Sequence, residues 1–216
     1  MGRFAQDFDI RALPSAHLLQ RSIYVDVKAA PEGPPVLFTM VDDDRLQHVV
    51  TDTVFADAAL AKDLQIRHFE DQVEELIEHC ERDDRMLIVF GADLHDQTTQ
   101  HSCHQERLSQ VLTDVRPVLL QTLAGDTRRR RGPTLVDFMR KADLPISRQV
   151  GSKQTAQRIR YVRQQLFKHD AYSLITGTAK AKWTKFLQQG EQDCRGLQSL
   201  LKKLATSVSN APIAKD

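Results

Sequence analysis

The stretch SIYVDVKAAP (residues 22–31) decides the fold that we expect for this chain. Apolar residues occupy every second position from Ile23 to Val27, while Asp26 and Lys28 lie on the opposite face of the predicted strand. An antiparallel strand commonly has one face in the core and one face in water. Asp26 and Lys28 are therefore either a solvent-facing ion pair or part of a charged site.

Two further strands are predicted directly after this one. The turn residues APEGPP (30–35) precede the apolar run VLFTMV (36–41), and DDDR (42–45) separates that run from LQHVV (46–50). Turns this short favour an antiparallel meander, because antiparallel strands can be joined by tight hairpins.

The hydrophobic period then changes to that of a helix. In HFEDQVEELIEHCERDD (68–84) the apolar residues recur at helical spacing from Phe69 to Cys80. The continuous apolar run MLIVFG (86–91) follows, and such a run is typical of a strand buried on both faces. The order so far is β-β-β-α-β.

The C-terminal half is predicted to be mostly helical. Asp193 lies four residues before Leu197 and continues the apolar stripe of the last helix in its first turn. This carboxylate either points toward the core, which would require a specific explanation, or is an N-terminal acid favoured by the helix dipole. The predicted helices cover residues 107–123 (with a break or kink near Pro117), 132–145, 155–169 and 191–205.

Composition limits the class of protein. The 216 residues are 41% hydrophobic and 27% charged, which is ordinary for a globular α/β domain. No apolar run approaches the ~18 residues of a membrane span, and no secretory leader is recognisable. The three cysteines are odd in number and unclustered, so we expect no disulfide framework and a reducing, cytoplasmic location.

Charge is distributed unevenly along the chain. Residues 1–106 hold 9 basic and 21 acidic residues, a balance of −12, and residues 107–216 hold 21 and 8, a balance of +13. Such a split indicates either a basic face for a polyanion or two halves that meet within the fold. A phosphate-binding surface would use Arg128, Arg129, Arg130 and Arg131, continued by Arg158, Arg160 and Arg163, whereas most charge runs are simply solvated loops.

Three aspartates form the candidate site: Asp26 on the first strand, Asp96 just past the strand at 86–91, and Asp193 on the last helix. With the strand IYVDV and the terminal EQDCRGLQSLL, this order of elements resembles the DEDD-type 3′→5′ exonucleases of the ribonuclease H-like fold, in particular their predicted bacterial group. The resemblance covers roughly residues 20 to 206. Its motifs are short, and the order of elements carries most of it.

The resemblance implies an α/β fold with a mixed sheet of about five strands in β-β-β-α-β-α order, flanked by helices. It implies an N-terminal extension (1–20), one ribonuclease H-like domain (21–206) and a disordered tail (207–216). It also implies a two-metal phosphodiesterase in which Asp26, Asp96 and Asp193 bind Mg²⁺ or Mn²⁺.

Two residues depart from the family pattern. Lys28 stands where the family has a metal-bridging glutamate, and Gln189 stands where it has a tyrosine or histidine. We therefore expect a protein that binds single-stranded DNA or RNA, with weakened or lost hydrolysis, and we count Lys28 among the site residues. The alternatives are an active metal-dependent exonuclease and a protein-interaction subunit without enzymatic activity.

Two further features have competing interpretations. His95, His101, Cys103 and His104 could bind zinc, but they lack paired ligand spacing and fit a loop with scattered imidazoles better. Tyr172 and Trp183 could stack on bases, but aromatic residues on helices more often belong to the core.

Overall fold

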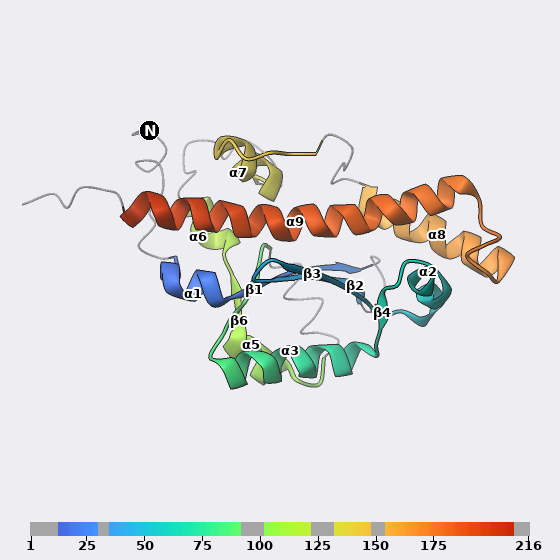
Figure 1. Ribbon diagram of the computed structural model, residues 1–216, viewed down its shortest axis with the longest axis horizontal. Coiled ribbons are helices and arrows are strands. Elements are labelled where there is room, and N and C mark those ends of the chain that lie inside the picture. Colours follow the sequence, from blue (N-terminus) through green and yellow to red (C-terminus); the bar gives the residue numbers. More distant parts are fainter. Residues whose placement is uncertain (1–12, 30–34, 92–101, 122–131, 148–153, 210–216) are drawn as a thin grey trace, which may run out of the picture.

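The computed structural model describes residues 13–29, 35–91, 102–121, 132–147 and 154–209, and the observations below concern those residues. They form a mixed α/β structure in which one sheet has helices on both faces (Figure 1), as predicted. The strand order is β4-β3-β2-β1-β5-β6. The strands are β1 (Ile23–Ala29), β2 (Pro35–Asp42), β3 (Arg45–Val50), β4 (Gln65–Ile66), β5 (Leu87–Val89) and β6 (Leu112–Asp114).

β1 lies at the centre of the sheet and joins its two halves. It pairs antiparallel with β2, which pairs antiparallel with β3, so the predicted meander is confirmed. On its other edge β1 pairs parallel with β5, and β5 pairs parallel with β6. The apolar runs of residues 22–28 and 86–91 are therefore neighbours, although the three strands β2, β3 and β4 and the helices η3, α2 and α3 come between them in the chain.

The two faces of β1 pack against different helices. The apolar residues Ile23, Val25 and Val27 contact α3 (Phe69–Asp83), whose predicted apolar stripe is buried. Tyr24 on the opposite face packs in a cluster with Cys194 and Leu197 of α9 (Gly177–Ser209). Both faces of the sheet are thus covered, with α9 on one side and α3 and α5 (Gln105–Val111) on the other (Figure 1).

The remaining helices complete the two layers. α1, α6 and α7 lie beside the half of α9 that ends at Ser209, and α2 and η3 lie beside the half that begins at Gly177. α8 runs along α9 and matches the prediction for residues 155–169. These elements are α1 (Ala16–Arg21), η3 (Thr53–Phe55), α2 (Ala56–Leu60), α6 (Arg116–Gln121), α7 (Leu135–Lys141) and α8 (Thr155–His169).

The predicted helix over residues 107–123 is wrong. The chain forms α5, then the short strand β6, then α6. With β4, which was also not located from the sequence, β6 brings the described part of the sheet to six strands rather than about five. β6 extends the parallel half by pairing with β5, and tertiary pairing here overrides the local helical pattern. Asp114 supports the turn, because its Oδ1 accepts hydrogen bonds from the backbone N–H groups of Gly91 and Arg116, both at 2.9 Å.

The last helix is much longer than the predicted 191–205. α9 begins at Gly177 and has 33 residues, and its first half buries Trp183, Phe186 and Leu187. Trp183 is 1% exposed and donates its Nε1–H to the carbonyl of Ala58 at 3.2 Å, so it belongs to the core, as does Tyr172. None of the described helices is both long and apolar enough to cross a membrane.

Ordered structure begins before residue 21 and continues past residue 206. Leu19 of α1 is 1% exposed, and its carbonyl accepts a hydrogen bond from the hydroxyl of Tyr24 at 2.7 Å. Leu19 of α1 thus packs in the same core cluster as the last turns of α9. α9 reaches Ser209, and residues 210–216 of the expected tail lie outside the described ranges.

Candidate functional site

Asp26, Lys28 and Asp193 converge beneath α9. Asp26 and Lys28 are two residues apart on β1 and share the face that α9 covers. The Lys28 ammonium donates hydrogen bonds to Asp26 Oδ1 at 2.8 Å and to Asp193 Oδ2 at 2.7 Å. The fourth predicted member, Asp96, lies outside the described residues. We call Asp26, Lys28 and Asp193 the Asp–Lys–Asp cluster.

The simpler explanations for these residues are wrong. Asp193 is not a first-turn acid of its helix, because α9 begins sixteen residues earlier, at Gly177. Asp26 and Lys28 do not form the wet face of a strand, because their side chains are only 17% and 13% exposed, and that of Asp193 is 16% exposed. Three charged groups are therefore held largely out of water.

One ammonium serves two carboxylates, so the Asp–Lys–Asp cluster carries a net negative charge when all three groups are ionised. Burial raises the pKa of Asp26 to about 7; the Lys28 ammonium opposes this shift and the Asp193 carboxylate adds to it. Burial alone would lower the pKa of Lys28, but the two carboxylates outweigh that effect and raise it. Asp26 Oδ2 is buried without a hydrogen-bond partner among the described residues. The lysine thus stays charged while Asp26 titrates near neutrality.

This arrangement predicts an unusual dependence of stability on pH. The folded state holds the Asp26 proton more tightly than the unfolded state, whose carboxyl has a pKa of about 3.9. The contribution of Asp26 to stability is therefore most favourable below that value and is lost as the pH rises toward about 7. Asp26→Asn mimics the protonated carboxyl and should remove this loss, which we expect to be on the order of 1–3 kcal/mol.

Urea denaturation of the wild type and of Asp26→Asn at pH 5 and at pH 8 measures the effect. Relative to the wild type, Asp26→Asn should have a higher unfolding free energy at pH 8 than it has at pH 5. Asp52→Asn is a suitable control, because Asp52 pairs with Arg163 and does not line the pocket of the Asp–Lys–Asp cluster. Equal pH dependence in the wild type and Asp26→Asn would show that Asp26 is ionised throughout this range.

The Asp–Lys–Asp cluster opens into a pocket of about 350 Å³. β1 and α9 form one side of this pocket, and the first residues of α7 and α8 form another. Its lining combines the three charged side chains with uncharged polar and apolar ones. The lining residues are Val25, Asp26, Lys28, Phe90, Thr134, Leu135, Val136, Thr155, Gln189, Asp193 and Leu197.

Gln189 has a structural role at the edge of this pocket. Its Oε1 accepts hydrogen bonds from Thr155 Oγ1 at 3.1 Å and from Arg158 Nη1 at 2.9 Å, and the residue is 3% exposed. The amide therefore ties the start of α8 to α9. A glutamine has no basic group, so it contributes no proton acceptor to the pocket at neutral pH.

The predicted basic surface is only partly formed by the described residues. Arg158 is 4% exposed, burial lowers its pKa, and it points inward to Gln189, so the expectation that it lies outside the buried face of α8 is wrong. Arg163 pairs with Asp52 and lies over the ring of Phe55. Arg160 is exposed as expected. Arg128–Arg131 lie outside the described residues. In the sequence, Arg131 comes three positions before Thr134, which lines the pocket.

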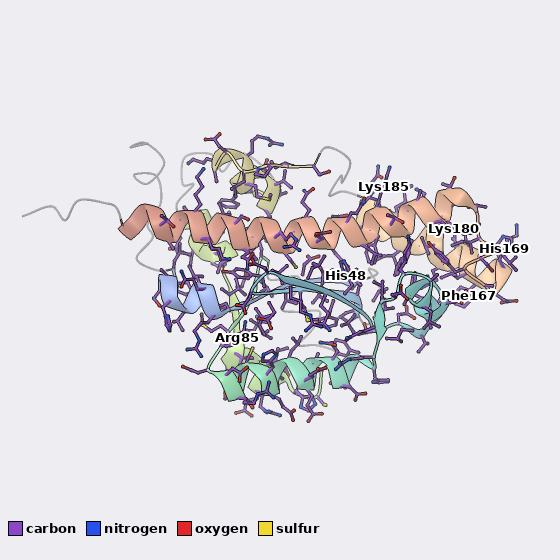
Figure 2. The ribbon with its side chains drawn as sticks, viewed as in Figure 1. His48, Arg85, Phe167, His169, Lys180 and Lys185 are labelled. Carbon is purple, nitrogen blue, oxygen red and sulfur yellow. The ribbon has the colours of Figure 1, made fainter. Side chains whose placement is uncertain are left out.

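A row of polar side chains next to Asp26 was not identified from the sequence. Asp26 is paired with Thr39 of β2, and Thr39 with His48 of β3, so all three point to the α9 side of the sheet. Thr39 Oγ1 and His48 Nδ1 are hydrogen-bonded at 3.0 Å, and burial lowers the pKa of His48. Figure 2 shows His48 between the sheet and α9. Only the strand register, which the sequence does not reveal, could have identified this row.

Comparison with protein families, with curated proteins and with solved structures finds no match to this chain. The description of this protein therefore rests on its own fold and site. It is an α/β protein with a mixed sheet of six described strands, and a largely buried Asp–Lys–Asp cluster lies at the edge of a pocket between β1, α7, α8 and α9.

Proposed function

We propose that this protein binds single-stranded nucleic acid on a ribonuclease H-like scaffold whose metal-dependent hydrolysis is weakened or lost. The observation that carries the proposal is the position of the Lys28 ammonium, 2.8 Å from one site carboxylate and 2.7 Å from the other. The ammonium takes the place where a divalent ion would contact both carboxylates. An Asp–Lys–Asp set does not fit a pair of metal ions. The ions would have to share the two carboxylates with the Lys28 ammonium, which repels them.

The sheet supports the ribonuclease H-like assignment. The resemblance requires the strand that carries Asp26 to lie beside the strand at 86–91, and the last helix to pack over Asp26. β1 pairs with β5, and Asp193 of α9 reaches Lys28 across 165 residues of sequence. Both requirements are met, and three of the expected site residues occupy one pocket.

The charge distribution supports nucleic acid as the partner. Residues 107–216 have a balance of +13, and the described part of that region contributes exposed cations on α8 and α9, among them Arg160, Lys168 and Lys185. The pocket lies against the starts of α7 and α8, and the Arg128–Arg131 run precedes α7 in the sequence. A basic half of the chain and a pocket with a net acidic cluster suit a strand whose backbone contacts cations while one nucleotide reaches inward.

Binding of a fluorescent single-stranded oligonucleotide at several salt concentrations tests this proposal. We expect affinity to fall steeply with salt, because each phosphate contact releases counterions. Replacing Arg128–Arg131 by alanine should weaken binding to every sequence and flatten the salt slope by as much as about 0.7 for each phosphate that the protein no longer neutralises. Arg45→Ala/Lys62→Ala is a control for the loss of positive charge elsewhere, since these two cations are exposed on the acidic half of the chain.

Two results would contradict the proposal in different ways. Absence of binding at low salt would favour the protein-interaction subunit. Rapid release of nucleotides in Mn²⁺ by the wild type, abolished in Asp193→Asn, would favour an active exonuclease.

A further inference from the structure

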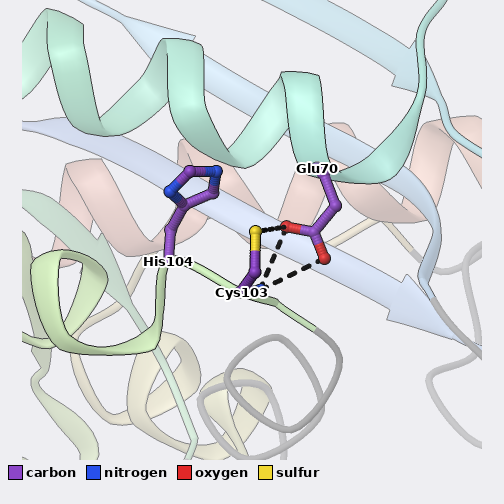
Figure 3. A group of neighbouring side chains, drawn as sticks. All are labelled: Glu70, Cys103 and His104. Atoms are coloured by element: carbon purple, nitrogen blue, oxygen red, sulfur yellow. Dashed lines mark hydrogen bonds between the residues drawn. The ribbon is translucent and has the colours of Figure 1, made fainter.

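A second group of possible ligands lies on the opposite face of the sheet from the Asp–Lys–Asp cluster. Figure 3 shows Glu70, Cys103 and His104 converging between the first turn of α3 and the loop that leads into α5. One potential ligand atom from each residue lies within 4.8 Å of the other two. Nothing in the proposed nucleic-acid function uses these residues.

Two of the three groups already have nearly the separation of ligands on a tetrahedral zinc ion. The Cys103 thiol donates a hydrogen bond to Glu70 Oε2 at 3.4 Å. Zinc holds sulfur at about 2.3 Å and oxygen at about 2.1 Å, so two such ligands on a tetrahedral ion are about 3.6 Å apart. The sulfur and the carboxylate oxygen therefore need to move by only a few tenths of an ångström.

The surroundings hold Glu70 in this position. Ser102 Oγ donates to Glu70 Oε2 at 3.0 Å, and the backbone N–H of Cys103 donates to both carboxylate oxygens at 3.3 Å. Supporting hydrogen bonds of this kind orient the carboxylates that bind metals. Cys103 is exposed, so an ion can reach the sulfur from solvent.

We propose that Glu70, Cys103 and His104 bind one Zn²⁺ ion through a carboxylate oxygen, a sulfur and an imidazole nitrogen, with a fourth position open to water. When Zn²⁺ binds, the Cys103 thiol, which is now hydrogen-bonded to Glu70, releases its proton to solvent. Zinc–sulfur and zinc–oxygen bonds then replace the S–H···O hydrogen bond. The ligand set selects zinc over Mg²⁺ or Ca²⁺, because sulfur and imidazole suit a softer ion than all-oxygen sites do. The ion would link α3 to the loop before α5.

Metal titration of the full chain tests the proposal. Zn²⁺ affinity is measured by competition with a chromophoric chelator, and Co²⁺ is used as a spectroscopic substitute. The wild type should bind one Zn²⁺ at this site, and its Co²⁺ form should show a thiolate-to-cobalt charge-transfer absorption. Cys103→Ala, His104→Ala and Glu70→Gln should each lower the Zn²⁺ affinity at least about 100-fold, since loss of even an outer-shell partner costs 10–100-fold.

Two controls separate this site from other metal binding. His17→Ala removes an exposed histidine on α1 and should leave the affinity unchanged. Asp193→Asn disables the Asp–Lys–Asp cluster and should also leave the charge-transfer absorption in place, so the test is independent of the proposed function. An unchanged affinity and spectrum in Cys103→Ala would overturn the proposal, and so would a wild type that binds no Zn²⁺ in the micromolar range. Glu70 would then serve only as an anchor for the loop.

Discussion

Lys28→Glu is expected to lower the unfolding free energy by about 3–5 kcal/mol in a chelating buffer at neutral pH. The variant would place a third carboxylate beside Asp26 and Asp193, which are largely buried and share the Lys28 ammonium in the wild type. The same change should raise Mn²⁺ affinity by at least roughly 100-fold, because a negative charge replaces a positive one a few ångströms from the ion. Mn²⁺ at 100 times its Kd should then return about 2.7 kcal/mol of stability.

The measurements are isothermal titration with Mn²⁺ and urea denaturation with and without the ion. Lys28→Met is the matched control, since it removes the ammonium without adding a ligand. It should lose stability in chelator but gain less Mn²⁺ affinity than Lys28→Glu. If Lys28→Glu is unfolded in chelator, folding on addition of Mn²⁺ is the readout. Should both the Mn²⁺ affinity and the metal-free stability of Lys28→Glu equal those of the wild type, the lysine does not occupy a cation position.

Gly190→Ala should destabilise the protein by about 3 kcal/mol, at the upper end of the cost of overpacking a core. Gly190 lies in the middle of α9, where the helix backbone meets β2. An added Cβ would lie 2.2 Å from Thr39 Oγ1 and 3.0 Å from Thr39 Cβ. Thr39 is fully buried on a central strand and is hydrogen-bonded to His48, so it has little room to move.

Gly196→Ala is the internal control for this prediction. Its Cβ would meet Met139 Sδ at 2.5 Å, but that contact is with the flexible end of a side chain that can adopt another rotamer. Alanine also favours the helix over glycine by about 1 kcal/mol, so Gly196→Ala should cost much less than Gly190→Ala or stabilise the protein. Thermal and urea denaturation of the two variants measures both values. Similar stabilities would mean that α9 can move away from the sheet at Gly190.

Much of the fold could be predicted because its elements have clear hydrophobic periods. The alternation in β1 and the helical stripe in α3 each indicated the correct element, and α8 was predicted with its observed bounds. β6 was missed because three residues between two helical segments show too short a pattern to be recognised. The first half of α9 was missed because the predicted helix was limited to the apolar stripe of residues 191–205; Gly190, just before it, allows the close approach of α9 to Thr39.

The candidate site could be predicted in part for a similar reason. The separation of Asp26 and Lys28 by two residues placed them on one face of a strand, and Asp193 continued an apolar helical stripe. Thr39 and His48 depend on strand register, and Glu70 meets Cys103 only through tertiary packing. Arg158 was predicted to continue the phosphate-binding surface, but it is 4% exposed, and Gln189 provides an acceptor for its buried guanidinium.

The length of α9 has a consequence for how the chain folds during its synthesis. Tyr24 and Val41 belong to the same core cluster as Leu197, Leu200, Leu201 and Leu204 of that helix, so the cover of one face of the sheet is incomplete until the end of the chain exists. At a synthesis rate of about 5–20 residues per second, the interval between the completion of β2 and the appearance of residue 204 is roughly 10–30 s. The N-terminal meander must spend that time with an apolar face exposed on the ribosome, where a chaperone that shields it would prevent aggregation.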